Sequence, residues 1–268
     1  MKSTHQRFKT RIATPIFACW LLAAGALHAG DIKVITSGAF TAAFLELAPQ
    51  YERITHNKVT TEFGPSMGTT HNAIPMRLER GESIDVVIMA APALNDLIAA
   101  GRVQKESRVD LVQSKIAMAV RAGAPRPDIR TLDAFKRTLL AAKSIAYSDS
   151  ASGVYLSGEL FPRLGVWEQI RGKARRIDAD PVGEAVAKGE VEIGFQQISE
   201  LRPVKGIDIV GELPPGAQRI TTFAAGIPVT AKQPETARAL IQWLSSPAAY
   251  GPITKSGLEP ARSKQAVH

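Results

Sequence analysis

Four short segments of the sequence combine small residues with hydroxyl or amide side chains, and each precedes a pattern typical of a helix. The first backbone N–H groups of a helix are unpaired and carry the positive end of its dipole, so such turns suit an anion such as a carboxylate or a tetrahedral oxyanion. Any single turn is equally compatible with an ordinary N-cap. Two such turns in each half of the chain together predict an anion site. The segments are TSGAFT at residues 36–41, GPSMGTT at 64–70, YSDSASGVY at 147–155 and GFQQISE at 194–200.

The side chains expected to bind the anion are uncharged donors within these four segments. Hydrogen bonds from a neutral donor to an ionised acceptor are shorter and stronger than neutral ones. The predicted binding residues are Ser37, Thr41, Ser66, Thr69, Thr70, Ser150, Ser152 and Gln197.

Acid–base chemistry has few candidates. His71 has a suitable intrinsic pKa, although a solvated surface position is the commoner explanation for such a histidine. Tyr155 lies one helical turn after Ser152, where it could close over a ligand or donate a proton. Glu200, like Asp149, could be a base or a helix cap, and its charge would repel an anionic ligand. The candidate catalytic residues are therefore His71, Tyr155 and Glu200, and the sequence does not decide which is the base.

Several kinds of site are not indicated. The single cysteine, Cys19, lies in the apolar N-terminal run, and beyond residue 29 the only histidines are His56, His71 and His268. Thiol chemistry and a metal site of several His or Cys ligands are therefore not expected. No glycine-rich nucleotide-binding motif is present, and aromatic residues are too scattered for a nucleic-acid stacking surface. We expect no metal, no cofactor and no nucleic-acid partner.

The N-terminus has the pattern of a cleavable secretory signal peptide over residues 1–29. Four of the 33 basic residues precede any acidic residue, and an uncharged apolar run follows at residues 12–27. Small residues place the cleavage site after Ala26 or Ala29, with an uncleaved anchor as the alternative. Removal of this segment leaves 29 basic against 25 acidic residues, so the overall charge of +8 overstates the charge of the mature chain. A periplasmic location follows from this pattern.

Hydrophobic runs and helical patterns alternate along the rest of the chain, which predicts an α/β fold built largely from parallel strands. The expected strands cover residues 31–37, 58–64, 85–90, 115–120, 144–147, 174–177, 192–196, 207–210 and 220–227. The expected helices cover residues 40–53, 69–79, 93–100, 131–142, 154–164, 183–188, 235–244 and 248–254.

The alternation stops at the proline-rich segment 124–130 and then begins again, which predicts two lobes with a ligand cleft between them. The first lobe is expected to comprise residues 30–114 and 226–268, and the second lobe residues 115–225. Ligands of open α/β sheets bind beyond the carboxyl ends of the strands, where the four turns would lie. The expected assembly is a monomer that binds a small anion.

The segments FGPS at 63–66, DVVI at 85–88 and ASGVY at 151–155 resemble the periplasmic molybdate-binding proteins of ABC transporters over residues 30–261. This resemblance implies the type II periplasmic-binding-protein fold. The family's ligand residues are only partly present, which indicates a ligand other than molybdate. The second-turn serine of the family is kept as Ser66, whereas its first-turn serine falls on Ala39 and its tyrosine falls on Gln197. The later backbone donors of the family fall near Ser152 and Pro181.

The segments GPSMGTT, AYSDSASGVY and EIGFQQISEL are similar to a branch of this family that resembles bacterial aconitate isomerase. The resemblance implies interconversion of trans- and cis-aconitate without a cofactor. An allylic proton shift of this kind needs a general base and donors for three carboxylates. The alternative is a binding protein that delivers an oxyanion or a di- or tricarboxylate to an ABC permease.

Overall fold

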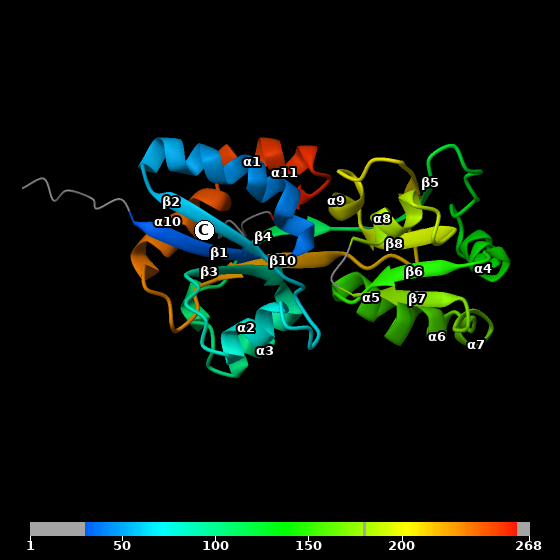
Figure 1. Cartoon of the computed structure of the whole chain (residues 1–268), viewed down its shortest axis with the longest axis horizontal. Coiled ribbons are helices and arrows are strands. Elements are labelled where there is room, and N and C mark those ends of the chain that lie inside the picture. Colours follow the sequence, from blue (N-terminus) through cyan, green and yellow to red (C-terminus); the bar gives the residue numbers. More distant parts are fainter. Residues whose placement is uncertain (1–29, 179–180, 262–268) are drawn as a thin grey trace, which may run out of the picture.

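The structure is a computed structural model that describes residues 30–178 and 181–261. Two lobes lie end to end along the long axis of the molecule, each with a sheet between two layers of helices (Figure 1). The predicted signal peptide, residues 1–29, lies outside the described residues.

The strands and helices alternate as the sequence predicts over most of the chain. The strands are β1 Asp31–Thr36, β2 Lys58–Phe63, β3 Val86–Ala90, β4 Val109–Ser114, β5 Ile116–Arg121, β6 Ile145–Ser148, β7 Ala174–Ile177, β8 Ile193–Gln197, β9 Ile207–Glu212, β10 Thr221–Gly226 and β11 Glu259–Pro260. The α-helices are α1 Gly38–Thr55, α2 Ile74–Glu79, α3 Ala91–Ala99, α4 Leu132–Ala141, α5 Ala151–Tyr155, α6 Phe161–Arg163, α7 Trp167–Ile170, α8 Val182–Ala187, α9 Ile198–Leu201, α10 Pro234–Leu244 and α11 Tyr250–Lys255. A π-helical turn, Leu156–Leu160, joins α5 to α6, and 3₁₀ turns cover Lys105–Ser107 and Pro247–Ala249.

The first lobe contains a six-stranded sheet in the order β11-β4-β10-β3-β1-β2. Strand β1 pairs in parallel with β2 and β3, whereas β10 runs antiparallel between β3 and β4. Alternate residues of β3 enter different cores: Val86 and Ile88 pack with α1, α10 and α11, and Val87 and Met89 pack with α2 and α3. Because both faces are covered, this strand reads as a continuous apolar run.

The second lobe contains a five-stranded sheet in the order β7-β6-β8-β5-β9. Strand β6 is parallel to β7 and β8, and β5 is antiparallel to β8 and β9. One face of this sheet packs against α4 to α7 and the other against α8 and α9, as Figure 1 shows. Both sheets are therefore mixed, and their parallel pairs place the carboxyl ends of β1, β2, β6 and β8 toward the junction of the lobes.

Two chain segments cross between the lobes, and one side chain ties them together. The first crossing runs directly from β4 to β5, and the second runs from β9 to β10. Gln218 of the second crossing accepts a hydrogen bond from the Ile116 N–H at 2.9 Å and donates one to the Ile116 carbonyl at 2.9 Å. Gln218 therefore links the two crossings at the junction of the lobes, which is called the hinge below.

Strand β10 marks one difference from the expected organisation. The sequence assigned residues 221–225 to the second lobe, but these residues are hydrogen-bonded to β3 and β4 in the larger sheet. The apolar run identifies a strand, whereas its sheet depends on pairing with segments distant in sequence.

Three further differences concern individual elements. The helix expected at residues 69–79 begins only at Ile74. The helix expected at 154–164 begins at Ala151 and passes through the π-helical turn. Strand β4 was not predicted, because VDLVQS mixes charged, polar and apolar residues.

Within residues 30–178 and 181–261, no helix has the length and apolar character needed to cross a membrane.

Candidate functional site

A cavity of about 450 Å³ lies between the lobes at the carboxyl ends of the parallel strands. The first lobe contributes the start of α1 and the loop after β2, including Gly38, Thr41 and Asn72. The second lobe contributes the ends of β6 and β8 and parts of α8 and α9. Its lining residues include Ser148, Asp149, Ser150, Pro181, Glu184, Gln196, Ser199 and Glu200.

A smaller recess adjoins this cavity, and the N-termini of α1 and α5 both open onto it. It shares Gly38, Ser150 and Glu200 with the larger cavity. Its remaining lining residues are Ser37, Ala39, Ala151, Ser152, Gln197 and Phe223. Two helix N-termini facing one recess provide unpaired N–H donors for an anion from both lobes.

The Glu200 carboxyl lies in this recess, against the first residue of α1. A Cβ atom at Gly38 would be 2.0 Å from Glu200 Oε1, so the close approach requires glycine. Burial raises the pKa of Glu200 to about 7, and the charge of Asp149 acts in the same direction. Hydrogen bonds from the Gln196 side chain and the Gln197 backbone N–H oppose this rise in pKa without cancelling it. A carboxyl group that titrates near neutral pH is suited to take up and return a proton.

Gln196 fixes the orientation of Glu200 and was not among the predicted site residues. Its Nε2 donates to Glu200 Oε1 at 3.0 Å, and its Oε1 accepts from the Val182 N–H at 2.9 Å. The side chain therefore joins Glu200 to the start of α8. Adjacent residues of a strand point to opposite faces, so the Gln-Gln pair at the end of β8 was a usable signal that Gln196 and Gln197 have different partners.

Two predicted binding residues keep buried polar atoms available for a ligand. Ser37 precedes α1, and among the described residues nothing pairs with its buried Oγ. Gln197 donates through Nε2 to Thr221 Oγ1 at 3.3 Å, while its buried Oε1 has no partner in the described part of the chain. Buried polar atoms are nearly always hydrogen-bonded, so these positions suit a bound molecule or water.

Other predicted binding residues take part in the local framework. Ser66 Oγ accepts from the Ala90 N–H at 2.9 Å, which leaves its own hydroxyl hydrogen available to donate. Ser152 Oγ lies 3.0 Å from Ser148 Oγ. Thr41 Oγ1 donates to the Ser37 carbonyl at 3.2 Å, one turn earlier in α1. Ser150 lies at the N-cap position of α5 and lines both cavities.

The segment that contains Thr69, Thr70 and His71 is a loop ahead of α2. Thr69 and His71 are exposed, and neither belongs to the lining of the two cavities, whereas their neighbour Asn72 does. Thr70 Oγ1 is buried and has no partner among the described residues. The expectation that His71 lies in the first turn of a helix is wrong, because α2 begins at Ile74.

Tyr155 is buried on the far side of α5 from the recess. Its hydroxyl donates to the Ala217 carbonyl at 3.0 Å and accepts from Arg163 Nη2 at 3.1 Å. The ring lines a separate interlobe cavity rather than the one that contains Glu200. Its hydroxyl proton is therefore directed to the second crossing.

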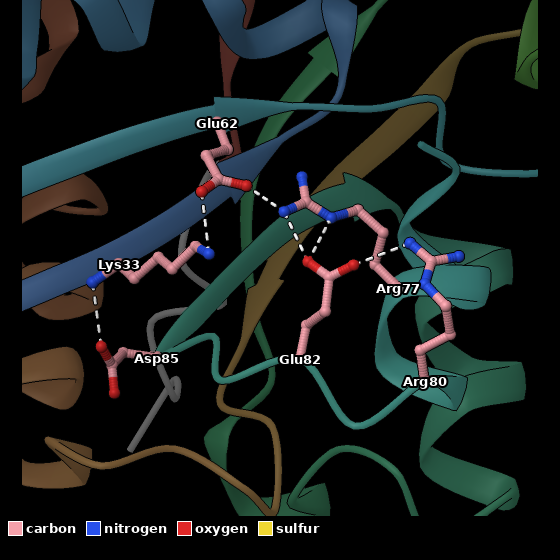
Figure 2. Close-up of polar contacts among 6 residues, drawn as sticks. All are labelled: Lys33, Glu62, Arg77, Arg80, Glu82 and Asp85. Carbon is pink, nitrogen blue, oxygen red and sulfur yellow. Dashed lines mark hydrogen bonds and ion pairs between the residues drawn. The ribbon is translucent and has the colours of Figure 1, made fainter. Parts of the chain in front are cut away.

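Arg77, a residue of α2, lines neither the cavity nor the recess and takes part in ion pairs. Figure 2 shows its guanidinium between Glu62 of β2 and Glu82, and Lys33 of β1 also pairs with Glu62 at 2.8 Å. Burial works to raise the pKa of Glu62, but the hydrogen bonds and charges of Lys33 and Arg77 hold that pKa below its ordinary value. Arg77 therefore stabilises the first lobe as part of an ion-pair network.

Residues 30–178 and 181–261 contain no group of three or more His, Cys, Asp or Glu side chains arranged to hold a metal ion. The chemistry that the described site offers is thus hydrogen bonding, helix N-terminal N–H groups and a proton acceptor of near-neutral pKa.

Two lobes with mixed sheets and an interlobe cleft define the type II periplasmic-binding-protein class. The chain belongs to the family of bacterial extracellular solute-binding proteins, which matches residues 32–259. A curated relative, the aconitate isomerase of a Pseudomonas species, is 50% identical over 254 residues, which cover 93% of this chain and 97% of the relative. The molybdate-binding protein of Azotobacter vinelandii is 26% identical over 269 residues, which cover 96% of this chain and 98% of that protein.

Solved structures show the same fold. The periplasmic molybdate-binding protein of Azotobacter vinelandii has a TM-score of 0.67 at 20% identity, over 86% of this chain and 100% of that protein. The sulfate-binding protein of Mycobacterium tuberculosis has a TM-score of 0.68 at 16% identity, over 87% of both chains. The family and fold expected from the sequence are confirmed.

Proposed function

We propose that this chain is a periplasmic isomerase that interconverts trans-aconitate and cis-aconitate by a proton shift without a cofactor. The identity of 50% to an aconitate isomerase over nearly the full length of both chains supports the reaction. The observation that carries the mechanism is the Glu200 carboxyl, which has a pKa of about 7 and lies between two helix N-termini. A base and an anion-stabilising environment are thereby available in one recess.

The proposed reaction begins with ionised Glu200. Its carboxylate removes one proton from the substrate methylene carbon, which breaks that C–H bond. The electron pair is delocalised over the neighbouring C=C bond and the carboxylate conjugated with it. The N-termini of α1 and α5 stabilise the developing charge. Protonated Glu200 then returns the proton to the carbon at the other end of the three-carbon unit, where a new C–H bond forms. The double bond has moved, and no redox partner is required.

Most of the remaining predicted residues receive supporting roles in this proposal. Ser37 offers its unpaired buried hydroxyl to the substrate. Gln197 offers the amide N–H that is not donated to Thr221. Ser66 lines neither the cavity nor the recess and supports the Ala90 N–H behind the wall. Ser150 and Ser152 act at the start of α5, and Thr41 acts at the wall of the cleft. Thr69 and Thr70 receive no role, because neither lines the cavity or the recess. Gln196 is a positioning residue for Glu200. The proposal gives the role of base to Glu200 rather than to His71 or Tyr155, since neither of these lines the recess.

Turnover tests this proposal directly. Purified protein incubated with trans-aconitate is expected to yield cis-aconitate, detected by chromatography. The kcat/KM of this conversion should rise as pH increases through about 7, because Glu200 must be ionised. Glu200→Gln is expected to lower kcat by about a hundredfold or more, since general base catalysis contributes roughly that much. Binding of the saturated analogue propane-1,2,3-tricarboxylate should be largely retained.

Glu184→Gln is the matched control, because it removes another carboxyl from the wall of the same cleft. Wild-type turnover in Glu200→Gln would reject Glu200 as the base. Absence of conversion by the wild-type protein would reject the isomerase function.

Membership of the extracellular solute-binding family favours one alternative: delivery of an oxyanion or a di- or tricarboxylate to an ABC permease. A binding protein would bind its ligand in a 1:1 ratio without converting it. At a hundredfold excess over Kd, the ligand would stabilise the fold by about 2.7 kcal/mol. A thermal-shift series with molybdate, sulfate, phosphate and tricarboxylates, each followed by product analysis, separates binding from turnover.

A further inference from the structure

A second interlobe cavity, of about 590 Å³, lies on the other side of the start of α5. Ala151, the first residue of α5, lines both this cavity and the recess that contains Glu200. The two spaces therefore adjoin at the N-terminus of one helix. The second cavity also has Tyr155 in its wall and is not used by the proton shift described above.

The walls of this second cavity contain two arginines and two acidic residues, Asp110 and Glu159, that pair with them. Arg108, just before β4, and Arg219, in the crossing before β10, both line it. The nine-residue helix α3 begins at the same cavity, with Ala91 and Pro92 in the lining. A helix N-terminus and two guanidinium groups all favour carboxylates.

Arg108 retains donor capacity after its ion pair is counted. Its Nη2 lies 2.7 Å from Asp110 Oδ1. Its Nε is buried, and no partner for it occurs within the described chain. A buried guanidinium donor without a partner is costly, and a carboxylate is the acceptor that its planar fork matches.

Arg219 is positioned by an aromatic ring. Its guanidinium carbon lies 4.0 Å from the centroid of the Tyr155 ring, and the Tyr155 hydroxyl is fixed by Ala217 and Arg163. Both hydrogen bonds from Arg219 to Glu159 come from Nη2 alone. The remaining N–H groups of the fork stay available for a ligand.

The cavity that contains Glu200 differs in having no basic residue in its described lining. Among the described residues that line it, the charged ones are Asp149, Glu184 and Glu200, all acidic. A tricarboxylate placed wholly in that cavity would be repelled by each ionised side chain. The two arginines lie in the wall of a space that adjoins the recess at Ala151.

We propose that Arg108 and Arg219 form a carboxylate subsite, which binds the part of the substrate that does not fit in the recess. This inference rests on the proposed function and defines its substrate class: a polycarboxylate that extends past Ala151, rather than a single compact oxyanion. Selectivity then comes from the arginine subsite, whereas proton transfer depends on Glu200.

The test uses Arg108→Gln and Arg219→Gln, with calorimetric titration of propane-1,2,3-tricarboxylate and steady-state kinetics with trans-aconitate. Each variant is expected to weaken tricarboxylate binding by about tenfold to a hundredfold, because each loses charge-assisted hydrogen bonds. The effect should fall on KM more than on kcat. Arg219→Lys, which keeps the charge but loses the fork, should be intermediate. Arg171→Gln, at an exposed ion pair on α7, is the matched control.

Glu159→Gln provides a change in the opposite direction. This substitution removes the carboxylate that pairs with Arg219, so tricarboxylate binding is expected to become severalfold tighter, a result that misfolding cannot mimic. If the arginine variants bind the tricarboxylate and show a KM within twofold of the wild-type values, the subsite proposal is wrong. The proposed isomerase function would still stand. A wild-type protein that binds the tricarboxylate through both arginines but converts no aconitate would overturn the proposed function and support the subsite.

Discussion

At the scale of single residues, the raised pKa of Glu200 makes the stability of the fold depend on pH. The carboxyl has an ordinary pKa of 4.5 and a folded-state pKa of about 7. Between these values the folded protein holds a proton that the unfolded chain has released, so the free energy of unfolding falls as pH rises. The loss across this interval is on the order of 3 kcal/mol.

Glu200→Gln cannot ionise and is expected to lack this loss. The variant should resemble wild type near pH 5 and exceed it in stability near pH 8. Urea unfolding at both pH values measures the difference, with Glu184→Gln as the control. A fall in stability between pH 5 and pH 8 that is as large in Glu200→Gln as in wild type would contradict the assignment.

The sequence could identify Glu200 as a candidate but could not select it. Its elevated pKa arises from burial and from the nearby charge of Asp149, and both depend on the packing of the two lobes. His71 was a candidate because of its intrinsic pKa, and a solvated position was the commoner explanation for it. The loop before α2 leaves it exposed. Intrinsic chemistry is readable from the residue type, whereas position in a cleft is not.

At the scale of elements, the start of α1 is shaped to admit a carboxyl from α9. Alanine is favoured over glycine by about 1 kcal/mol in a helix interior, so Gly38→Ala is not expected to weaken the helix itself. Its Cβ would meet Glu200 Oε1 at 2.0 Å, and the flexible side chain would have to leave the recess. Turnover is expected to fall by about tenfold or more because the base is misplaced, while the melting temperature stays close to that of wild type.

Gly153→Ala makes the contrasting case within α5. Its Cβ would lie 1.6 Å from the Ser148 carbonyl oxygen, a backbone atom that cannot swing aside. This variant should lose stability as well as activity. Thermal unfolding and aconitate turnover, measured on both variants, separate the two effects, and unchanged turnover in Gly38→Ala would argue against Glu200 acting from this position.

Most elements were predictable because their apolar periodicity is local. Helix α4 follows its predicted limits closely, and Thr131 caps it by accepting from the Ala134 N–H at 3.1 Å. The hydroxyl-rich loop at residues 69–73 was mistaken for the start of a helix, since Thr and Asn residues at an N-terminus resemble caps. Its backbone instead bonds within a turn, with the Ala73 N–H donating to the Thr70 carbonyl at 2.9 Å.

At the scale of the whole molecule, the two lobes were predictable from the interruption and resumption of the βα alternation. The sheet that contains β10 was not, because antiparallel pairing with β3 and β4 joins segments far apart in the chain. The proposed arginine subsite could not be predicted from the sequence for the same reason. Arg108 precedes β4 and Arg219 lies in the second crossing, so the fold alone brings them to one cavity.

The crossings also determine how the two halves of the site are held. Gln218 bonds to both the N–H and the carbonyl of Ile116, so Gln218→Ala would leave the Ile116 N–H without this partner, while the carbonyl keeps the Leu213 N–H at 3.0 Å. A loss of about 1–3 kcal/mol in unfolding free energy is expected. Because Gln218 lines neither the recess nor the arginine cavity, a direct contact with substrate is not involved.

Substrate binding should nevertheless weaken in Gln218→Ala, since one ligand must engage the α1 and α5 N-termini and the arginines at the same time. A looser hinge increases the cost of bringing these groups together. The expected signature is a several-fold higher KM for trans-aconitate with kcat largely kept, alongside the lower stability. If the Gln218→Ala protein is less stable but its KM is unaltered, the prediction is wrong. The relative position of the lobes would then be set by the ligand and the lobe surfaces rather than by the hydrogen bonds between the crossings.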